Sequence, residues 1–227
     1  MRSPKLCTVI TKLDEKFLDK ANMSDIIEVR IDMIGESWTS LANKLKRPWI
    51  ACNRRKEEGG MWHDTEKRRV DELLKALKLG AEYVDIELLS PNLNSVVEEV
   101  KLKGKKVIVS YHDFNGTPDF LDLKKILEKE IEAGADVCKI VTFAKKFEDN
   151  ITILKFLLQE SNITPMVAFC MGETGVVSRI LSPFFGSKFT YASIDEGLES
   201  AAGQVSVENL REFYKIFEET FGDVNAV

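Results

Sequence analysis

Eight short apolar segments, rich in β-branched residues, recur along this 227-residue chain and alternate with segments of helical periodicity. Their length and composition are those of buried strands. They span residues 5–11, 26–32, 48–53, 83–88, 106–112, 137–143, 165–171 and 189–194. Helices are predicted between them, among others at 64–80, 118–134 and 206–222. Strict alternation of strand and helix implies a parallel sheet, because parallel neighbours need a crossover connection.

Such a sheet can lie open and doubly wound, or it can close into a (β/α)8 barrel. An open nucleotide-binding sheet usually carries a glycine fingerprint after its first strand, and the segment TVITKLDEK has none. We therefore expect an α/β protein with one domain, residues 1–227, folded as a (β/α)8 TIM barrel.

Helix ends and faces follow from the same pattern. Glycines are expected just beyond the helix ends, where a left-handed residue caps the last turn; these are Gly80, Gly104, Gly134 and Gly222. In the helix at 118–134, four apolar residues share one face that should be buried; they are Leu123, Ile126, Leu127 and Ile131.

The net charge and the positions of the cysteines limit which binding partners and which cellular compartment are expected for the protein. The net charge of −5 predicts no general attraction to nucleic acid or to an anionic membrane. No segment reaches the roughly 20 apolar residues of a membrane span, and the apolar run near the N-terminus is too short for a signal peptide. The cysteines lie singly in apolar segments, which indicates reduced thiols and a cytoplasmic protein. They are Cys7, Cys52, Cys138 and Cys170.

Two predicted strands carry charges on one side only. In IIEVRID, Glu28, Arg30 and Asp32 share a face, and in YVDIEL, Asp85 and Glu87 do. The apolar sides can pack against helices, so the charged sides should point into the barrel. Because a buried unpaired charge costs several kcal/mol, these groups should pair with one another or with a ligand. A purely structural network of ion pairs is an open alternative.

Lys139 interrupts the otherwise apolar strand VCKIVTF. Burial lowers the pKa of a lysine by penalising the ammonium form, and a free amine can attack a ketone to form an imine. The alternative is that Lys139 only neutralises the inward carboxylates of Glu28, Asp85 or Glu87.

His112 ends the strand KVIVSYH, and active sites of barrels gather at the C-terminal ends of strands. Its position suits proton transfer, although a histidine there can also be a packing residue. The chain has two histidines and neither an HxxH nor a CxxC motif, so no metal site is predicted.

Seven motifs, in order, resemble those of the type I 3-dehydroquinate dehydratases. They are EVRID (28–32), NRRKEEGG (53–60), YVDIE (83–87), SYHDF (110–114), CKIV (138–141), MGETGVVSR (171–179) and SAAGQ (200–204). The resemblance covers residues 5–221 and implies a shikimate-pathway lyase without metal or organic cofactor, which removes water from 3-dehydroquinate.

The resemblance also implies roles for individual residues. Lys139 would form the imine with the C3 ketone, His112 would be the general acid and base, and Glu58 would orient His112. Substrate-binding residues would be Glu28, Arg30, Arg54, Met171, Arg179, Ser200 and Gln204. Among them, Arg179 would hold the carboxylate, and the loop of Ser200 and Gln204 would close over the ligand.

Two rival functions fit the same pattern. One is another Schiff-base barrel lyase, such as an aldolase, which usually carries a phosphate-binding loop near the last two strands. The other is a barrel that binds a small acid without turnover. The family resemblance also suggests a homodimer, and the early first strand suggests that an N-terminal hairpin found in some relatives is missing here.

Overall fold

Nine short strands with mostly buried residues form the centre of the structure, a computed structural model that describes residues 3–221. The strands are β1 (Leu6–Ile10), β2 (Ile26–Arg30), β3 (Trp49–Cys52), β4 (Tyr83–Glu87), β5 (Lys106–His112), β6 (Val137–Phe143), β7 (Met166–Met171), β8 (Thr190–Ser193) and β9 (Val205–Ser206). Strands β1 to β8 all lie inside their predicted ranges. The two-residue β9 was not predicted.

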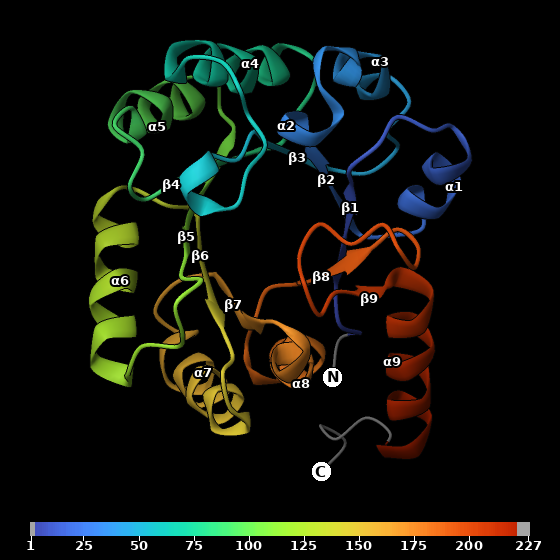
Figure 1. Cartoon of the computed structure of the whole chain (residues 1–227), viewed down its shortest axis with the longest axis vertical. Helices are drawn as coiled ribbons and strands as arrows, with labels where there is room; N and C mark the ends of the chain where they lie inside the picture. The colour runs from blue at the N-terminus through green and yellow to red at the C-terminus, as the bar shows by residue number, and fades with distance from the viewer. Residues whose placement is uncertain (1–2, 222–227) are drawn as a thin grey trace.

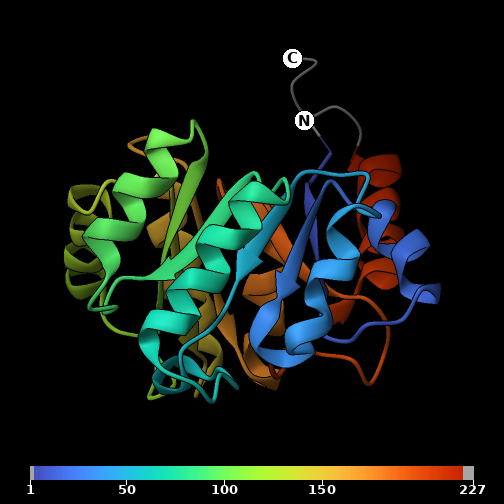
Figure 2. The same cartoon turned by 90° about the horizontal axis from the view of Figure 1, so that it is seen from above.

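Helices surround these strands, as the views along and across the barrel show (Figures 1 and 2). They are α1 (Lys16–Asn22), α2 (Ile31–Ile34), α3 (Thr39–Ala42), α4 (Glu66–Lys78), α5 (Leu93–Leu102), α6 (Phe120–Glu132), α7 (Phe147–Glu160), α8 (Val176–Leu181) and α9 (Val207–Phe221). Side chains cap the longer ones: Thr65 accepts a hydrogen bond from the first turn of α4, and Asp119 does the same for α6. None of the described helices is both long enough and apolar enough to cross a lipid bilayer.

Three of the predicted helix-ending glycines have the positive φ that a left-handed cap requires: 98° at Gly80, 66° at Gly104 and 89° at Gly134. Gly222 lies outside the described residues. The predicted apolar face of α6 is partly wrong, because Leu123 and Leu127 are buried but Ile131 is 38% exposed.

The sheet closes into the expected (β/α)8 barrel with one incomplete junction. All strand pairs are parallel, in the order β7-β6-β5-β4-β3-β2-β1-β8-β9, so β1 lies between β2 and β8. Within residues 3–221, β7 and β8 share no ladder; a single hydrogen bond from the amide of Lys188 to the carbonyl of Met166 (2.8 Å) joins their beginnings. The outer edge of β8 pairs with β9 instead. We call the β7–β8 junction the seam.

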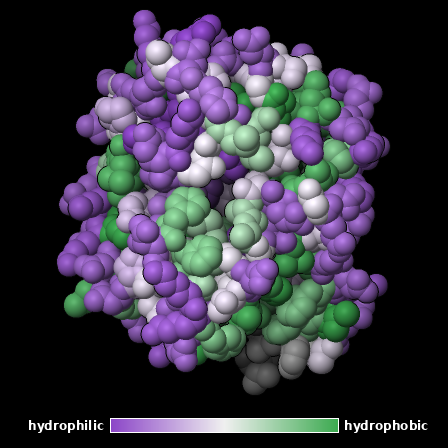
Figure 3. Space-filling model, in the orientation of Figure 1, coloured by the Kyte–Doolittle hydropathy of each residue, from purple (hydrophilic) through white to green (hydrophobic). Residues whose placement is uncertain are grey.

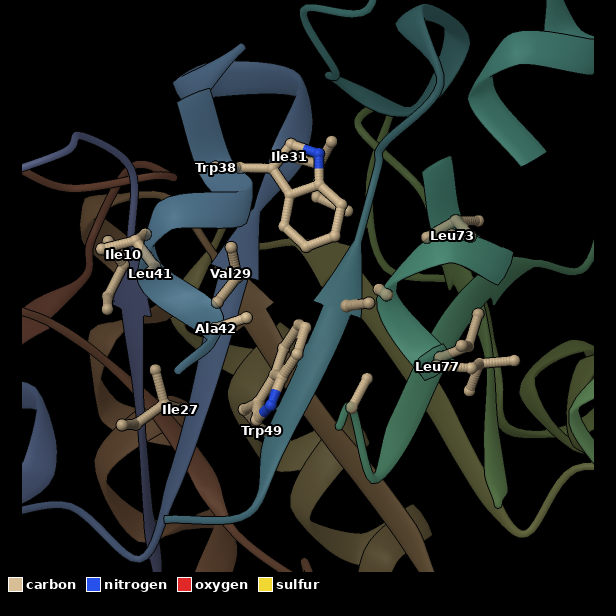
Figure 4. Packing of buried hydrophobic residues seen from close by; sticks show 14 of the residues in the cluster. Ile10, Ile27, Val29, Ile31, Trp38, Leu41, Ala42, Trp49, Leu73 and Leu77 are labelled. Carbon is tan, nitrogen blue, oxygen red and sulfur yellow. The ribbon is translucent and has the colours of Figure 1, made fainter. Parts of the chain in front are cut away.

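Apolar residues fill the space between the barrel wall and the helices. Ile27 and Val29 of β2 and Trp49 of β3 pack there against Trp38 and Leu73 (Figure 4). Inside the barrel, a second apolar cluster contains residues near the strand beginnings, including Cys7, Ile26, Ile50, Ile108 and Phe189. The polar side chains that point inward therefore gather toward the C-terminal ends of the strands.

Candidate active site

A cavity of about 170 Å³ opens at the C-terminal ends of the strands. The space-filling view shows this face hollowed near its centre (Figure 3). Every side chain for which the sequence suggested a catalytic or binding role lines this cavity: Glu28, Arg30, Arg54, Glu58, His112, Lys139, Met171, Arg179, Ser200 and Gln204. They come from eight different elements or loops, and the barrel brings them together.

Lys139 lies inside the barrel, where two carboxylates contact its ammonium group. Its Nζ is 2.8 Å from Oδ2 of Asp85 and 3.5 Å from Oε2 of Glu28. The strand register places Lys139 of β6 beside Ser110 of β5, and Ser110 beside Glu87 of β4. The Lys139 side chain therefore reaches Asp85, two residues before Glu87, across the inside of the barrel. The Ser110 hydroxyl donates to Oδ1 of Asp85 at 2.6 Å and completes this arrangement.

The expectation of a lowered pKa for Lys139 is wrong. Burial alone would lower it, but the carboxylates of Asp85 and Glu28 outweigh that effect, so the pKa of Lys139 is raised above its usual value. In the free protein, Lys139 therefore neutralises the carboxylates of Asp85 and Glu28, which is the alternative role that the sequence left open. The amine must lose a proton before it can attack a carbonyl carbon.

A chain of alternating charges continues from Asp85 away from the cavity. Arg54 donates to Asp85 at 2.8 Å and lies 3.3 Å from Glu87, which in turn lies 3.0 Å from Arg69. Arg69 ends the chain by donating two hydrogen bonds to Glu66 on α4. Burial would raise the pKa of Asp85, but Arg54 and Lys139 hold it well below its usual range, so Asp85 remains ionised.

Arg30 and Asp32 form a second buried pair at the rim. The guanidinium of Arg30 donates to both carboxylate oxygens of Asp32, at 2.9 and 2.7 Å. Asp32 lies beyond the end of β2, in α2, and also accepts hydrogen bonds from the backbone amides of Arg54 and Met61. This pair fixes the Arg30 side chain at the cavity and ties the loop after β3 to the end of β2.

His112 and Glu58 form a close pair. Nδ1 of His112 lies 2.8 Å from Oε2 of Glu58, which also accepts the backbone amide of His112 at 3.2 Å. Glu58 is held by a tight turn in which a side chain at Gly60 would overlap the carbonyl oxygen of Arg54.

Burial shifts both members of this pair toward their neutral forms. Burial, helped by the nearby cations Arg54 and Lys139, lowers the pKa of His112 well below its usual value. Burial raises the pKa of Glu58 to about 7. The imidazole is therefore neutral at physiological pH and can accept a proton.

Arg179 is the buried cation of the site without a counter-ion in the described structure. Its side chain is 1% exposed, and Nε and Nη2 have no hydrogen-bond partner. Burial lowers its pKa to about 10. A buried guanidinium is costly unless an anion pairs with it, so this geometry favours a carboxylate-bearing ligand.

The loop between β8 and β9 covers one side of the cavity. Oε1 of Gln204 accepts hydrogen bonds from the amide and hydroxyl of Ser200 at 2.8 and 3.2 Å. The amide of Gly172 donates to the carbonyl of Ala202 at 3.0 Å. Gly203 has φ +74°, and a side chain there would lie 2.2 Å from the carbonyl oxygen of Gly172. The loop is thus docked onto the end of β7.

The sequence did not single out the aromatic residues of the cavity, namely Phe114, Phe143, Phe169 and Tyr191. Three of them, Phe143, Phe169 and Tyr191, lie in apolar strands, where aromatic residues are usually part of the core. The alternation of Val167, Phe169 and Met171 along β7 could have indicated them, because Met171 was already placed at the cavity.

One group of side chains has the spacing of a metal-ligand set: oxygens of Glu28 and Asp85 and Sγ of Cys52 lie within 4.8 Å of one another. The ammonium group of Lys139 already contacts both carboxylates.

Fold and cavity together define a (β/α)8 barrel enzyme with an amine, an imidazole and a guanidinium arranged for a small anionic carbonyl compound. A family model described as type I 3-dehydroquinase matches residues 7–220. The chain belongs to the type I 3-dehydroquinase family.

Relatives and solved structures agree with this assignment. The 3-dehydroquinate dehydratase of Dehalococcoides mccartyi (strain 195) is 39% identical over 95% of this chain and 96% of its own. That of Methanococcus maripaludis (strain C6) is 37% identical over 92% and 99%. The crystal structure of 3-dehydroquinate dehydratase from Geobacillus kaustophilus has a TM-score of 0.86 at 22% identity, over 97% and 93% of the two chains, and shares the fold.

Proposed function

We propose that this protein, as one catalytic domain of residues 1–227, converts 3-dehydroquinate to 3-dehydroshikimate by loss of water through a lysine Schiff base. The reaction belongs to the shikimate pathway and makes the protein a hydro-lyase. The observation that carries the proposal is that Lys139, His112 and the unpaired Arg179 line one buried cavity. The family membership supplies the substrate.

Binding precedes the chemistry. Arg179 takes the substrate carboxylate, which gives the guanidinium the anion that the free protein lacks. Glu28, Arg30 and Arg54 bind ring hydroxyls, and Met171 forms an apolar wall. Ser200 and Gln204 close over the carboxylate end.

The first covalent step needs a free amine. The neutral imidazole of His112 takes a proton from the ammonium group of Lys139, and the amine then attacks the C3 ketone carbon. The imidazolium protonates the ketone oxygen to give the carbinolamine; His112 then carries a second proton from the nitrogen to this hydroxyl, which leaves as water. The product is a protonated iminium ion on Lys139. The carboxylates of Asp85 and Glu28, which disfavour the free amine, stabilise this cation.

Dehydration follows. The positive nitrogen acidifies the C2–H bond, and His112 removes that proton to give an enamine. The enamine expels the C1 hydroxyl, which leaves as water with the proton that His112 returns. Glu58 holds the imidazole through Nδ1 in both steps. Water finally hydrolyses the iminium, which releases the product and restores Lys139.

The direct test is to incubate the protein with 3-dehydroquinate and follow the absorbance of the conjugated enone. Borohydride added with the substrate should leave a mass increment on the Lys139 peptide, and Lys139→Ala should abolish both signals. A protein without turnover at substantial enzyme concentration, or with the label on another lysine, contradicts the proposal. Cleavage of a carbon–carbon bond would instead favour an aldolase.

The proposal includes a cytoplasmic location and a homodimer. Four buried, unpaired thiols support a reducing compartment. A row of exposed apolar residues on α7 supports an interface between copies: Phe147, Ile151 and Leu158 are 56%, 42% and 60% exposed. Light scattering on the purified protein tests the dimer, and a monomer at micromolar concentration contradicts it.

A further inference from the structure

The two cations that the mechanism uses each lie over an aromatic ring. Nζ of Lys139 is 4.3 Å from the centroid of the Tyr191 ring. Cζ of Arg179 is 4.3 Å from the centroid of the Phe169 ring. Both distances fall inside the roughly 6 Å range in which the negative face of a ring attracts a cation.

These two rings also contact each other across the seam. The centroids of Phe169 and Tyr191 are 6.0 Å apart and the planes are inclined by 60°, an edge-to-face contact. Phe169 belongs to β7 and Tyr191 to β8, the neighbouring strands that share no ladder in the described part of the chain. Ring contacts therefore join the strands at the level of the cavity, where main-chain hydrogen bonds do not.

Within the described residues, few polar contacts hold the Tyr191 side chain and the Arg179 guanidinium in place, whereas Lys139 also pairs with Asp85 and Glu28. Among the described residues, no hydrogen bond holds the buried Tyr191 hydroxyl, and the carboxylate of Glu28 lies near it. Burial and the nearby carboxylate of Glu28 raise the pKa of Tyr191, so the phenol stays neutral and its ring face stays attractive to a cation. For Arg179, Nε and Nη2 likewise lack hydrogen-bond partners in the described part of the chain, and the guanidinium lies over the Phe169 ring.

We propose that Phe169 and Tyr191 are positioning residues that fix the separation between the amine of Lys139 and the guanidinium of Arg179. This inference rests on the proposed function. A substrate must present a ketone to Lys139 and a carboxylate to Arg179 at once.

Steady-state kinetics with 3-dehydroquinate on single and double variants test the proposal. Tyr191→Leu should lower kcat about tenfold with little change in KM, because the ring acts on the reacting nitrogen. Phe169→Leu should raise KM about tenfold, because the ring holds the carboxylate receptor; both sizes follow from the strength of buried cation–π contacts. Tyr191→Phe keeps the ring and should stay within about twofold of the unchanged protein. In the double Leu variant, the factor by which kcat/KM falls should be smaller than the product of the two single-variant factors, because the two residues share a contact.

Phe120→Leu is the matched control, because Phe120 makes an edge-to-face contact with Phe156 at 5.8 Å, remote from either cation. The proposal fails if Tyr191→Leu and Phe169→Leu cost no more activity than this control. It also fails if Tyr191→Phe is as damaging as Tyr191→Leu, since the hydroxyl and not the ring would then matter.

A measurement without substrate separates this proposal from the proposed function. Reductive methylation of Lys139 by formaldehyde and a borane, followed by peptide mass spectrometry across pH, reports the pKa of its amine. Tyr191→Leu should lower that pKa and Tyr191→Phe should not; equal profiles overturn the inference. The other groups acting on this amine are unchanged in these variants: Asp85, Glu28, Arg54 and Cys52. Lack of turnover in the unchanged protein would refute the proposed function, whereas normal turnover in all variants would refute the positioning role alone.

Discussion

Replacing Arg179 by methionine should stabilise the protein while disabling it. Methionine keeps most of the buried stem and removes a guanidinium that has no counter-ion. Burial lowers the pKa of Arg179 from its usual value to about 10, which corresponds to a cost of about 3 kcal/mol in the free energy of unfolding at neutral pH. The lost contact with the Phe169 ring offsets about 1 kcal/mol of the gain.

The net gain is about 2 kcal/mol, or roughly 4 to 8 °C in Tm for a domain of this size. The sign of this effect follows from the linkage between protonation and folding. Because folding lowers the pKa of this base, its charged form destabilises the folded protein at every pH below about 10. The destabilisation fades as the pH rises through 10. Meanwhile, kcat/KM should fall by about 10² to 10³, the usual loss when one partner of a buried charged contact is removed.

Chemical denaturation at pH 7 measures the change in the free energy of unfolding, and enone absorbance measures the change in kcat/KM. Arg69→Met is the control, since Arg69 is equally buried but paired with Glu66 and Glu87. Breaking that pairing should destabilise the protein by about 3 to 5 kcal/mol. If Arg179→Met destabilises the protein as Arg69→Met does, the argument from an uncompensated charge is wrong.

Three further changes test other parts of the site. His112→Ala should nearly eliminate dehydration while some borohydride-trapped adduct still forms; full turnover would refute its acid–base role. Glu58→Gln should remove the ionisation near pH 7 that the raised pKa of Glu58 adds to the pH profile of kcat/KM, so an unchanged profile would exclude Glu58. Gly203→Ala should raise KM at least tenfold, because the added carbon meets the carbonyl of Gly172 and undocks the loop; an unchanged KM would show that loop closure is unimportant.

The strand order and the inward charges could be predicted because they depend on local pattern. Continuous apolar segments marked the strands, and alternation in IIEVRID and YVDIEL separated the face toward the helices from the face toward the barrel. The pKa of Lys139 could not be predicted in the same way. It depends on which carboxylates touch the amine, and the contact with Asp85 joins side chains of β4 and β6, which are 54 residues apart in the chain.

Other features lacked a sequence signal. Strand β9 has two residues, too short for any periodicity, and it forms because the edge of β8 is open at the seam. Tyr191 and Phe169 are aromatic residues in apolar strands, and the sequence does not distinguish them from ordinary core residues. Their contacts with Lys139 and Arg179 join positions far apart in the chain, so no local pattern reveals them.

The seam gives this barrel one line along which its wall can widen. Elsewhere, parting two strands means breaking a row of main-chain hydrogen bonds, whereas at the seam few hydrogen bonds and the contact between the Phe169 and Tyr191 rings have to be broken. The barrel wall should therefore open first between β7 and β8 in local unfolding, while the rest of the cylinder keeps its shape. Amide hydrogen exchange should then be fastest, among the barrel strands, at the facing edges of these two.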